Sequence, residues 1–154
     1  MATYSFKSVG KTQEQSAVET LKKTEFPFGI KTPVSIGSDS ILDMNYKIED
    51  QLADNLKNLL LTNWGERLGL YRFGANLRPI TTELVSQDDF DTEAISRIKS
   101  AVESWMPYIE LEDFTSSIDR TDLKNTAVIK ITISYNIPSI QSFNKRIQIV
   151  LYAI

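Results

Sequence analysis

The chain has 154 residues, 42% of them hydrophobic and 24% charged, and its formal net charge is −3. This length and composition are typical of a soluble globular protein with a core of its own. The small negative charge gives little attraction to nucleic acid or to an anionic membrane, because both require clustered Lys and Arg.

Two residue types are absent, since the sequence contains neither Cys nor His. It therefore lacks thiol nucleophiles, disulfides, the usual base of a serine triad and the commonest zinc ligand. We expect no metal and no cofactor. No apolar run is long enough to span a membrane, and residues 1–5 lack the features of a signal peptide, so we expect the chain to fold in a cytoplasm.

Residues 1–40 are expected to form an extended arm rather than core. A short helix over Gln13–Lys23 would have only a thin apolar stripe. Farther along, Phe26 and Phe28 lie in a segment that two prolines keep out of regular structure. Two interpretations of these aromatics stay open: they pack on their own domain, or the arm lies on a partner subunit.

A first amphipathic helix is predicted over residues 44–62. The run Ser40–Asp43 fits a capping box before it. Gly65 is expected to stop the helix, because glycine enters the left-handed conformation cheaply. One apolar stripe at helical spacing marks its buried face: Ile48, Leu52, Leu56, Leu59 and Leu60.

A short helix is predicted to begin at Pro79, with inward positions at Ile80, Leu84 and Val85. A second main helix is predicted over residues 92–105, capped by Asp91 or Thr92. Pro107 would end it, because the residue before a proline avoids the helical region. The apolar stripe of this helix consists of Ile95, Ile98, Val102 and Trp105.

From Ile109 onward the apolar pattern has a period of two, which is typical of strands. Strands are predicted over Ile109–Glu112, Ala127–Tyr135 and Lys145–Ile154. In the second strand, Ile129, Ile131, Ile133 and Tyr135 share one face. The last strand is partly apolar on its other face too, at Val150 and Tyr152, which indicates that something covers it.

This order of elements predicts an α+β fold. Two main amphipathic helices would pack on a small, three-stranded, antiparallel C-terminal sheet. Residues 41–154 would form this single domain, and residues 1–40 the arm that precedes it.

Carboxylates are the main groups left for catalysis, and a glycosidase needs two of them beside the sugar, one with a raised pKa. The acids near turns and helix ends are Glu66, Asp88, Asp89, Asp91 and Glu103. Their spacing selects no pair, and Asp89 and Asp91 fit turn or cap roles. We therefore expect no enzyme, and a carboxylate-dependent peptidoglycan hydrolase stays open as an alternative.

The loop after the first helix holds three glycines and a charged pair. Gly65, Gly69 and Gly74 do not form a phosphate loop, because no Gly-Lys-Ser or Gly-Lys-Thr is present and no strand precedes them. Glu66 and Arg67 are adjacent and point different ways. Two roles stay open: a buried Arg67 that bonds backbone carbonyls and fixes the loop, or a contact with another subunit.

Two motifs resemble the baseplate wedge proteins of contractile phage tails, the W-like family. That family was once labelled lysozyme-like and includes a baseplate subunit of type VI secretion systems. The first motif is a helix ending in Leu60-Leu61-Thr62, then Gly65-Glu66-Arg67, Phe73-Gly74 and Leu77. The second is an aromatic residue followed by Glu-Pro-Arg-Ile. Here it is Trp105-Met106-Pro107-Tyr108-Ile109, without the family's Glu and Arg.

The resemblance covers about residues 40–154 and implies a structural protein of the virion, at the tail baseplate, assembled in the host cytoplasm. The implied partners are larger wedge subunits around the tail tube and a sheath protein that pairs with a sheet edge to begin sheath assembly. Neither nucleic acid nor membrane is implied. A small cytoplasmic adaptor stays open as a third class. The residues expected to fix the loop or bind a partner are Gly65, Glu66, Arg67, Phe73, Gly74, Trp105, Pro107 and Tyr108.

Overall fold

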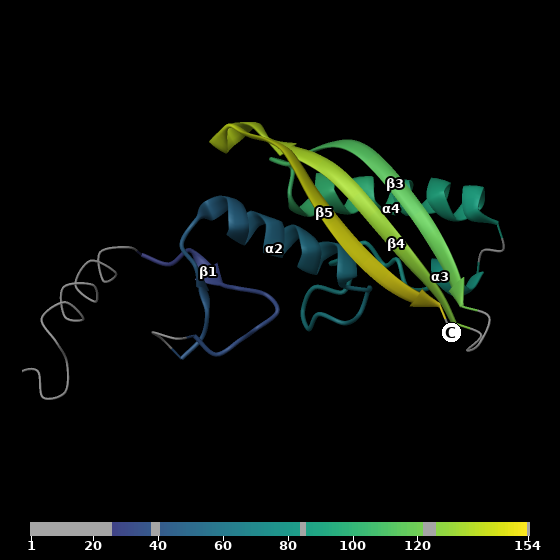
Figure 1. The fold of residues 1–154 in the computed structure, drawn as a ribbon, viewed down its shortest axis with the longest axis horizontal. Coiled ribbons are helices and arrows are strands. Elements are labelled where there is room, and N and C mark those ends of the chain that lie inside the picture. Colours follow the sequence, from purple (N-terminus) through teal and green to yellow (C-terminus); the bar gives the residue numbers. More distant parts are fainter. Residues whose placement is uncertain (1–25, 38–40, 84–85, 122–125, 154) are drawn as a thin grey trace, which may run out of the picture. The chain divides into compact units, whose positions relative to one another are not determined.

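A computed structural model of the chain describes residues 26–37, 41–83, 86–121 and 126–153 (Figure 1). The helix predicted over Gln13–Lys23 lies outside the described residues. The chain divides into two compact units between Gln51 and Leu52. Each unit is described by itself below, and the domain boundary expected near residue 40 stays a prediction. Among the described helices, none is long and apolar enough to cross a membrane.

The first unit contains a small antiparallel ladder of β1 (Gly29–Ile30) and β2 (Met44–Asn45). The Phe28 N–H donates to the Asn45 carbonyl at 2.8 Å, so the pairing continues past the end of β1. The side chains of Phe26 and Phe28 remain 87% and 58% exposed. β1 lies between the two prolines, so this segment does contain regular structure. The extended arm, and a partner subunit as the cover of these aromatics, stay predictions.

The first main helix, α2, runs over Ile48–Leu61 and begins later than predicted because Met44 pairs as a strand instead. The expected capping box is wrong, since Asp43 accepts a hydrogen bond from the Ser35 hydroxyl at 2.8 Å rather than starting a helix. Ser40 lies outside the described residues. Leu56, Leu59 and Leu60 of the predicted stripe are buried and Leu52 is partly buried against the core, whereas Ile48 is 41% exposed, so its place on the buried face is wrong.

The short helix α3 (Ile80–Glu83) is present, with Ile80 buried, and Leu84 and Val85 lie outside the described residues. The second main helix, α4 (Gln87–Trp105), begins earlier than predicted. Its cap is Ser86, whose hydroxyl oxygen accepts from the Asp89 N–H at 3.2 Å.

The caps expected at Asp91 and Thr92 are therefore wrong, because both residues lie inside α4. The Thr92 hydroxyl donates to the Asp88 carbonyl at 2.9 Å, one turn back along the helix. The predicted C-terminus is confirmed, because the helix stops at Trp105, two residues before Pro107.

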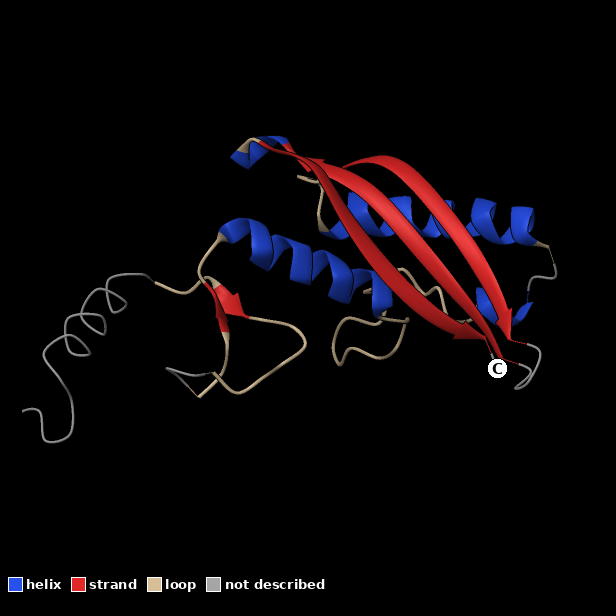
Figure 2. Cartoon of the chain, viewed as in Figure 1, coloured by secondary structure: helices blue, strands red, loops and turns tan. Residues whose placement is uncertain are grey.

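The sheet is three-stranded and antiparallel, as predicted, and its strand order is β3-β4-β5 (Figure 2). Its strands are β3 (Glu110–Thr121), β4 (Thr126–Ile137) and β5 (Ser142–Ala153). β3 is longer than predicted. A bulge between Leu111 and Asp113 shifts the alternation of inward and outward residues by one, so the strand's period of two is not visible in the sequence.

One face of the sheet packs against helices and the other faces outward. The inward residues of β4, Ile129, Ile131, Ile133 and Tyr135, are all at most 4% exposed. They form one core with the apolar residues of α2, α3 and α4 in the second unit. On the outward face of β5, Val150 is 36% and Tyr152 61% exposed, so the cover expected over these two residues is not part of this chain's described structure.

Candidate functional site

The loop between α2 and α3 is fixed first by its main chain. The Ala75 N–H donates to the Leu59 carbonyl at 3.1 Å, and the Asn76 N–H to the Thr62 carbonyl at 3.3 Å. Gly74, with φ of 109°, lies so close that a Cβ there would be 2.1 Å from the Thr62 carbonyl oxygen. Only glycine fits at this position, and the loop therefore returns tightly onto the end of α2.

The Glu66 carboxylate closes the first turn of the loop. It accepts from the Asn63 side-chain amide at 2.9 Å and from the Asn63 N–H at 2.7 Å. These two bonds, with a smaller contribution from the Arg78 charge, lower the pKa of Glu66 despite a weak opposing effect of burial. Asn63 also accepts from the Arg78 N–H at 3.2 Å through its side-chain oxygen. Glu66 is thus an ionised structural acceptor.

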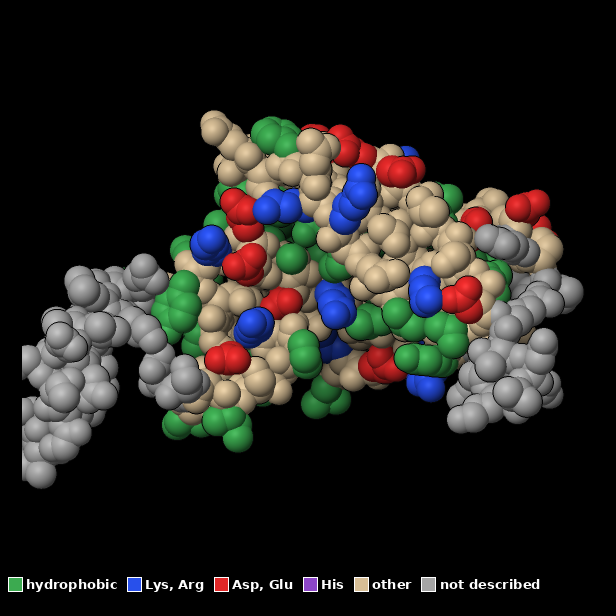
Figure 3. Space-filling view, in the orientation of Figure 1, with side chains coloured by type: hydrophobic (Ala, Val, Ile, Leu, Met, Phe, Trp, Pro, Cys, Tyr) green, Lys and Arg blue, Asp and Glu red, His purple; other side chains and the backbone are tan. Residues whose placement is uncertain are grey.

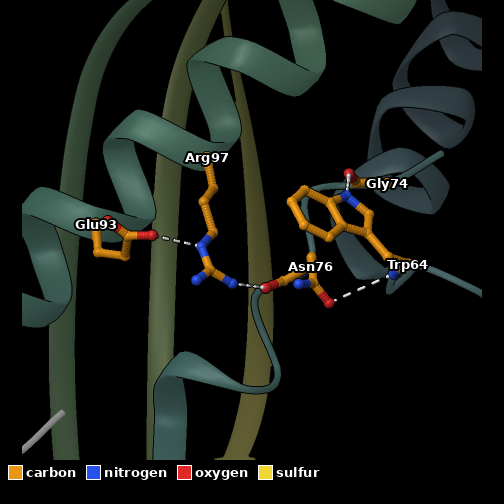
Figure 4. Close-up of polar contacts among 5 residues, drawn as sticks. All are labelled: Trp64, Gly74, Asn76, Glu93 and Arg97. Carbon is orange, nitrogen blue, oxygen red and sulfur yellow. Dashed lines mark hydrogen bonds and ion pairs between the residues drawn. The ribbon is translucent and has the colours of Figure 1, made fainter. Parts of the chain in front are cut away.

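Side chains attach the rest of the loop to its surroundings, as Figure 4 shows. The indole N–H of Trp64 donates to the Gly74 carbonyl at 3.1 Å. From α4, the Arg97 guanidinium donates to the Asn76 carbonyl at 2.7 Å and to Glu93 at 2.6 Å. Arg97 is therefore a residue that ties the loop to the second main helix.

Arg67 has a different role from the one expected of a buried arginine. It is exposed, and its guanidinium lies 4.3 Å from the centroid of the Phe73 ring. The Phe73 ring meets Trp105 edge-on, with 5.2 Å between centroids and an interplanar angle of 65°. Such cation–aromatic and aromatic–aromatic contacts stabilise the side chains that make them.

These contacts line a hollow of about 640 Å³ that brings the two sequence motifs together. Five of the predicted site residues line it: Glu66, Arg67, Phe73, Trp105 and Tyr108. Asn55, Asn58 and Leu59 of α2 also line it. Segments far apart in the sequence thus form one surface.

The three other predicted residues shape this region without lining the hollow. Gly65 has φ of 85°, and its N–H donates to the Tyr71 carbonyl at 2.8 Å, which closes the loop's inner turn. Gly74 permits the close return onto Thr62. Pro107 is exposed and follows the end of α4.

The altered second motif changes the chemistry of the hollow. Met106 is only 5% exposed and its N–H donates to the Val102 carbonyl at 2.8 Å, so it acts as the apolar end of α4. Tyr108 is 41% exposed, and burial of its remaining surface raises the pKa of its phenol. In place of the Glu and Arg of the resembling motif, this chain has a buried Met106 and a half-exposed Tyr108.

Three of the carboxylates weighed above as catalytic candidates, Glu66, Asp89 and Asp91, accept structural hydrogen bonds. A general acid requires a raised pKa, whereas that of Glu66 is lowered. Asp89 accepts from the Ser86 hydroxyl at 2.8 Å and Asp91 from the Ser116 hydroxyl at 2.5 Å, so both have structural partners. Within the described ranges, no group of three or more acidic side chains could hold a metal ion.

Three residues that hold the loop were missed by sequence reasoning: Asn63, Asn76 and Arg97. Asn76 carries a weak signal, because asparagine tolerates the positive φ of 51° that it adopts here. Arg97 gives none, since its contact with the Asn76 carbonyl joins residues from different elements.

Comparisons with known proteins agree with this fold. No family model and no curated protein matches the sequence. The structure is similar to a chain of the anti-feeding prophage baseplate, with a TM-score of 0.58 and 18% identity, over 77% of this chain and 90% of that one. It is also similar to a protein described as a candidate tail lysozyme from Geobacter sulfurreducens, with a TM-score of 0.50 and 24% identity, over 70% and 90%. The chain thus has an α+β fold of the type found in the baseplate of a phage-like particle.

Proposed function

We propose that this chain is a structural wedge subunit in the baseplate of a contractile tail and has no enzymatic activity. One observation carries the proposal: residues from both resembling motifs line a single hollow beside α2. The shared fold with a chain of a baseplate structure supports it. In this proposal, the larger wedge subunits around the tail tube bind at the hollow through Arg67, Trp105 and Tyr108.

The surface of the hollow favours a protein partner. Trp, Tyr and Arg are the residues that most often carry binding energy at interfaces, and here they lie together at partial exposure. Because Met106 and Tyr108 replace charged residues of the family, the contact would depend on packing and phenol hydrogen bonds more than on ion pairs.

Co-expression with the large wedge subunits from the same gene neighbourhood tests this contact. The double change Arg67→Ala with Tyr108→Ala should reduce recovery of the complex by about tenfold or more, as expected for interface residues of these types. Lys130→Ala removes a cation from the outward sheet face and should leave recovery unchanged. Equal recovery with both variants, or no complex with the unaltered chain, would contradict the proposal.

The sheath is proposed to begin on the edge of β5, an outer strand of the sheet. A free edge offers unpaired backbone groups, and added strands bind such edges by main-chain hydrogen bonds. Val150→Lys with Tyr152→Lys should slow sheath polymerisation on assembled baseplates, because charged edge residues discourage strand addition. Unchanged polymerisation would exclude β5 as the template.

A peptidoglycan hydrolase remains the competing class, because one similar structure is described as a tail lysozyme. Cell-wall suspensions should keep their turbidity when the purified chain is added. Clearing that disappears in Glu66→Gln would reverse the assignment, and the lowered pKa of Glu66 makes this outcome unexpected.

A further inference from the structure

A separate hollow of about 420 Å³ lies between α4 and the edge strand β3, and its floor is apolar. Val102 and Ile133 are each 2% exposed, whereas Ile95, on the same stripe of α4, is 44% exposed. Leu111 and Phe114 of β3 are partly buried beside it. Ile95, Leu111 and Phe114 are therefore the apolar side chains of this hollow that a partner can reach.

The rim of this hollow is acidic. Four carboxylates line it, those of Glu103, Glu110, Glu112 and Asp113, with Lys99 as the single cation among the lining residues. The rim thus carries as much net negative charge as the whole chain, whose formal charge is −3. In Figure 3, acidic side chains gather along the upper edge of the view, over the first half of β3. An apolar floor inside an acidic rim is complementary to a basic, amphipathic segment.

The shape of β3 favours a helix over an added strand at this place. The bulge between Leu111 and Asp113 interrupts the regular ladder beside the hollow. Bulges and charged side chains both disfavour pairing at a sheet edge. The α4 side of the hollow extends from Ile95 to Glu103, which is about 12 Å or two helical turns. A partner helix of two to three turns matches this length.

We propose that the hollow between α4 and β3 binds a short, basic, amphipathic helix of a partner protein. Its apolar face contacts Ile95, Leu111 and Phe114, and its Lys or Arg side chains lie toward Glu103 and Glu110. The surface is distinct from the hollow beside α2, and the proposal does not depend on the function proposed above.

A fluorescent peptide of Leu and Lys with helical apolar spacing is the probe, measured by anisotropy against the full chain at moderate salt. A scrambled peptide of the same composition and a Leu–Glu peptide are the comparison ligands. The helical Leu–Lys peptide should bind, and both comparison ligands should bind at least about tenfold more weakly. The scrambled peptide lacks the continuous apolar face, and the Leu–Glu peptide lacks the positive charge. Equal binding of the scrambled peptide, or no binding of the probe, would overturn the proposal.

Matched variants distinguish binding in the hollow from a general attraction of the basic peptide to an acidic protein. Glu103→Gln with Glu110→Gln should weaken binding about tenfold. Asp88→Asn with Asp119→Asn makes the same charge change on the same two elements, away from the rim, and should have little effect. Ile95→Asn tests the apolar floor and should also weaken binding. An equal loss in both charge pairs would contradict the proposal.

Circular dichroism and thermal unfolding should show that all these variants are folded. If Ile95→Asn unfolds, the milder Ile95→Ala takes its place. Sedimentation of the free chain tests the other occupant, a second copy. Concentration-dependent dimers that disappear in Ile95→Asn would overturn the proposal in favour of self-association.

Discussion

The three-stranded sheet and the loop between α2 and α3 reach a fixed shape by different means. In the sheet, antiparallel ladders pair the strands, and burial of alternate residues such as Ile131 and Ile149 fixes which face is inward. In the loop, positive φ angles and particular side-chain bonds, such as Arg97 to the Asn76 carbonyl, hold the backbone. Regular structure here depends on repeated pattern, and the candidate site depends on individual residues.

The largest expected effect is in the sheet. Ile131 is completely buried, and Ile131→Ala should lower the free energy of unfolding by about 4 kcal/mol, through lost burial and the cavity left behind. Urea denaturation measures this change. The neighbouring outward change Thr132→Ala should cost less than about 1 kcal/mol. Similar costs at the two positions would mean that the sheet lacks the one-sided burial described here.

The second effect tests the tight return of the loop. Gly74→Ala adds a Cβ that would clash with the Thr62 carbonyl oxygen and strains a backbone with φ of 109°. We expect a loss of about 3 kcal/mol in unfolding free energy. Gly69 also has positive φ, 81°, but nothing lies within 4 Å of its added Cβ, so Gly69→Ala should cost only about 1 kcal/mol. Equal costs would contradict the close approach at Gly74.

The same contrast explains what could be predicted from the sequence. The period of two in β4 is visible because each inward residue is Ile or Tyr, and the α+β class follows from such strands coming after the amphipathic helices. In β3 the bulge after Leu111 breaks the alternation, so most of that strand was missed. The start of α4 was misplaced because Ser86 competes with Asp91 and Thr92, and all three residue types are good caps.

The candidate site was foreseen as a set of residues but not as a geometry. Both motifs were expected to matter, and five of the predicted site residues do line one hollow. The stacking of Arg67 on Phe73 could not be read from the sequence, because it depends on how the loop folds back. The contact of Arg97 joins residues from different elements and has no local signature. Whether a partner binds there stays a prediction.

The third effect tests the tie between the loop and α4. Arg97→Met should cost about 2 kcal/mol in unfolding free energy, because it removes a charged hydrogen bond to the Asn76 carbonyl. Glu93→Gln is the control, since it weakens only a partly exposed ion pair along the helix and should cost about 0.5 kcal/mol. Chemical denaturation of both variants gives the comparison. If Glu93→Gln were the more costly change, Arg97 would stabilise the fold mainly through its ion pair with Glu93 and not through its contact with the loop.

The smallest effect is at Glu66 and depends on pH. Hydrogen bonds from Asn63 lower the pKa of Glu66 in the folded chain. A carboxyl group with a lowered folded pKa stabilises the fold above its unfolded pKa and loses that contribution as the pH falls through the folded value. Glu66→Gln should therefore reduce the free energy of unfolding slightly at neutral pH, and the difference from the unaltered chain should disappear at acidic pH. Denaturation midpoints measured across this range check the sign. A difference that grows on acidification would mean that Glu66 is held protonated, which is the state a general acid requires and the opposite of the role found in this loop.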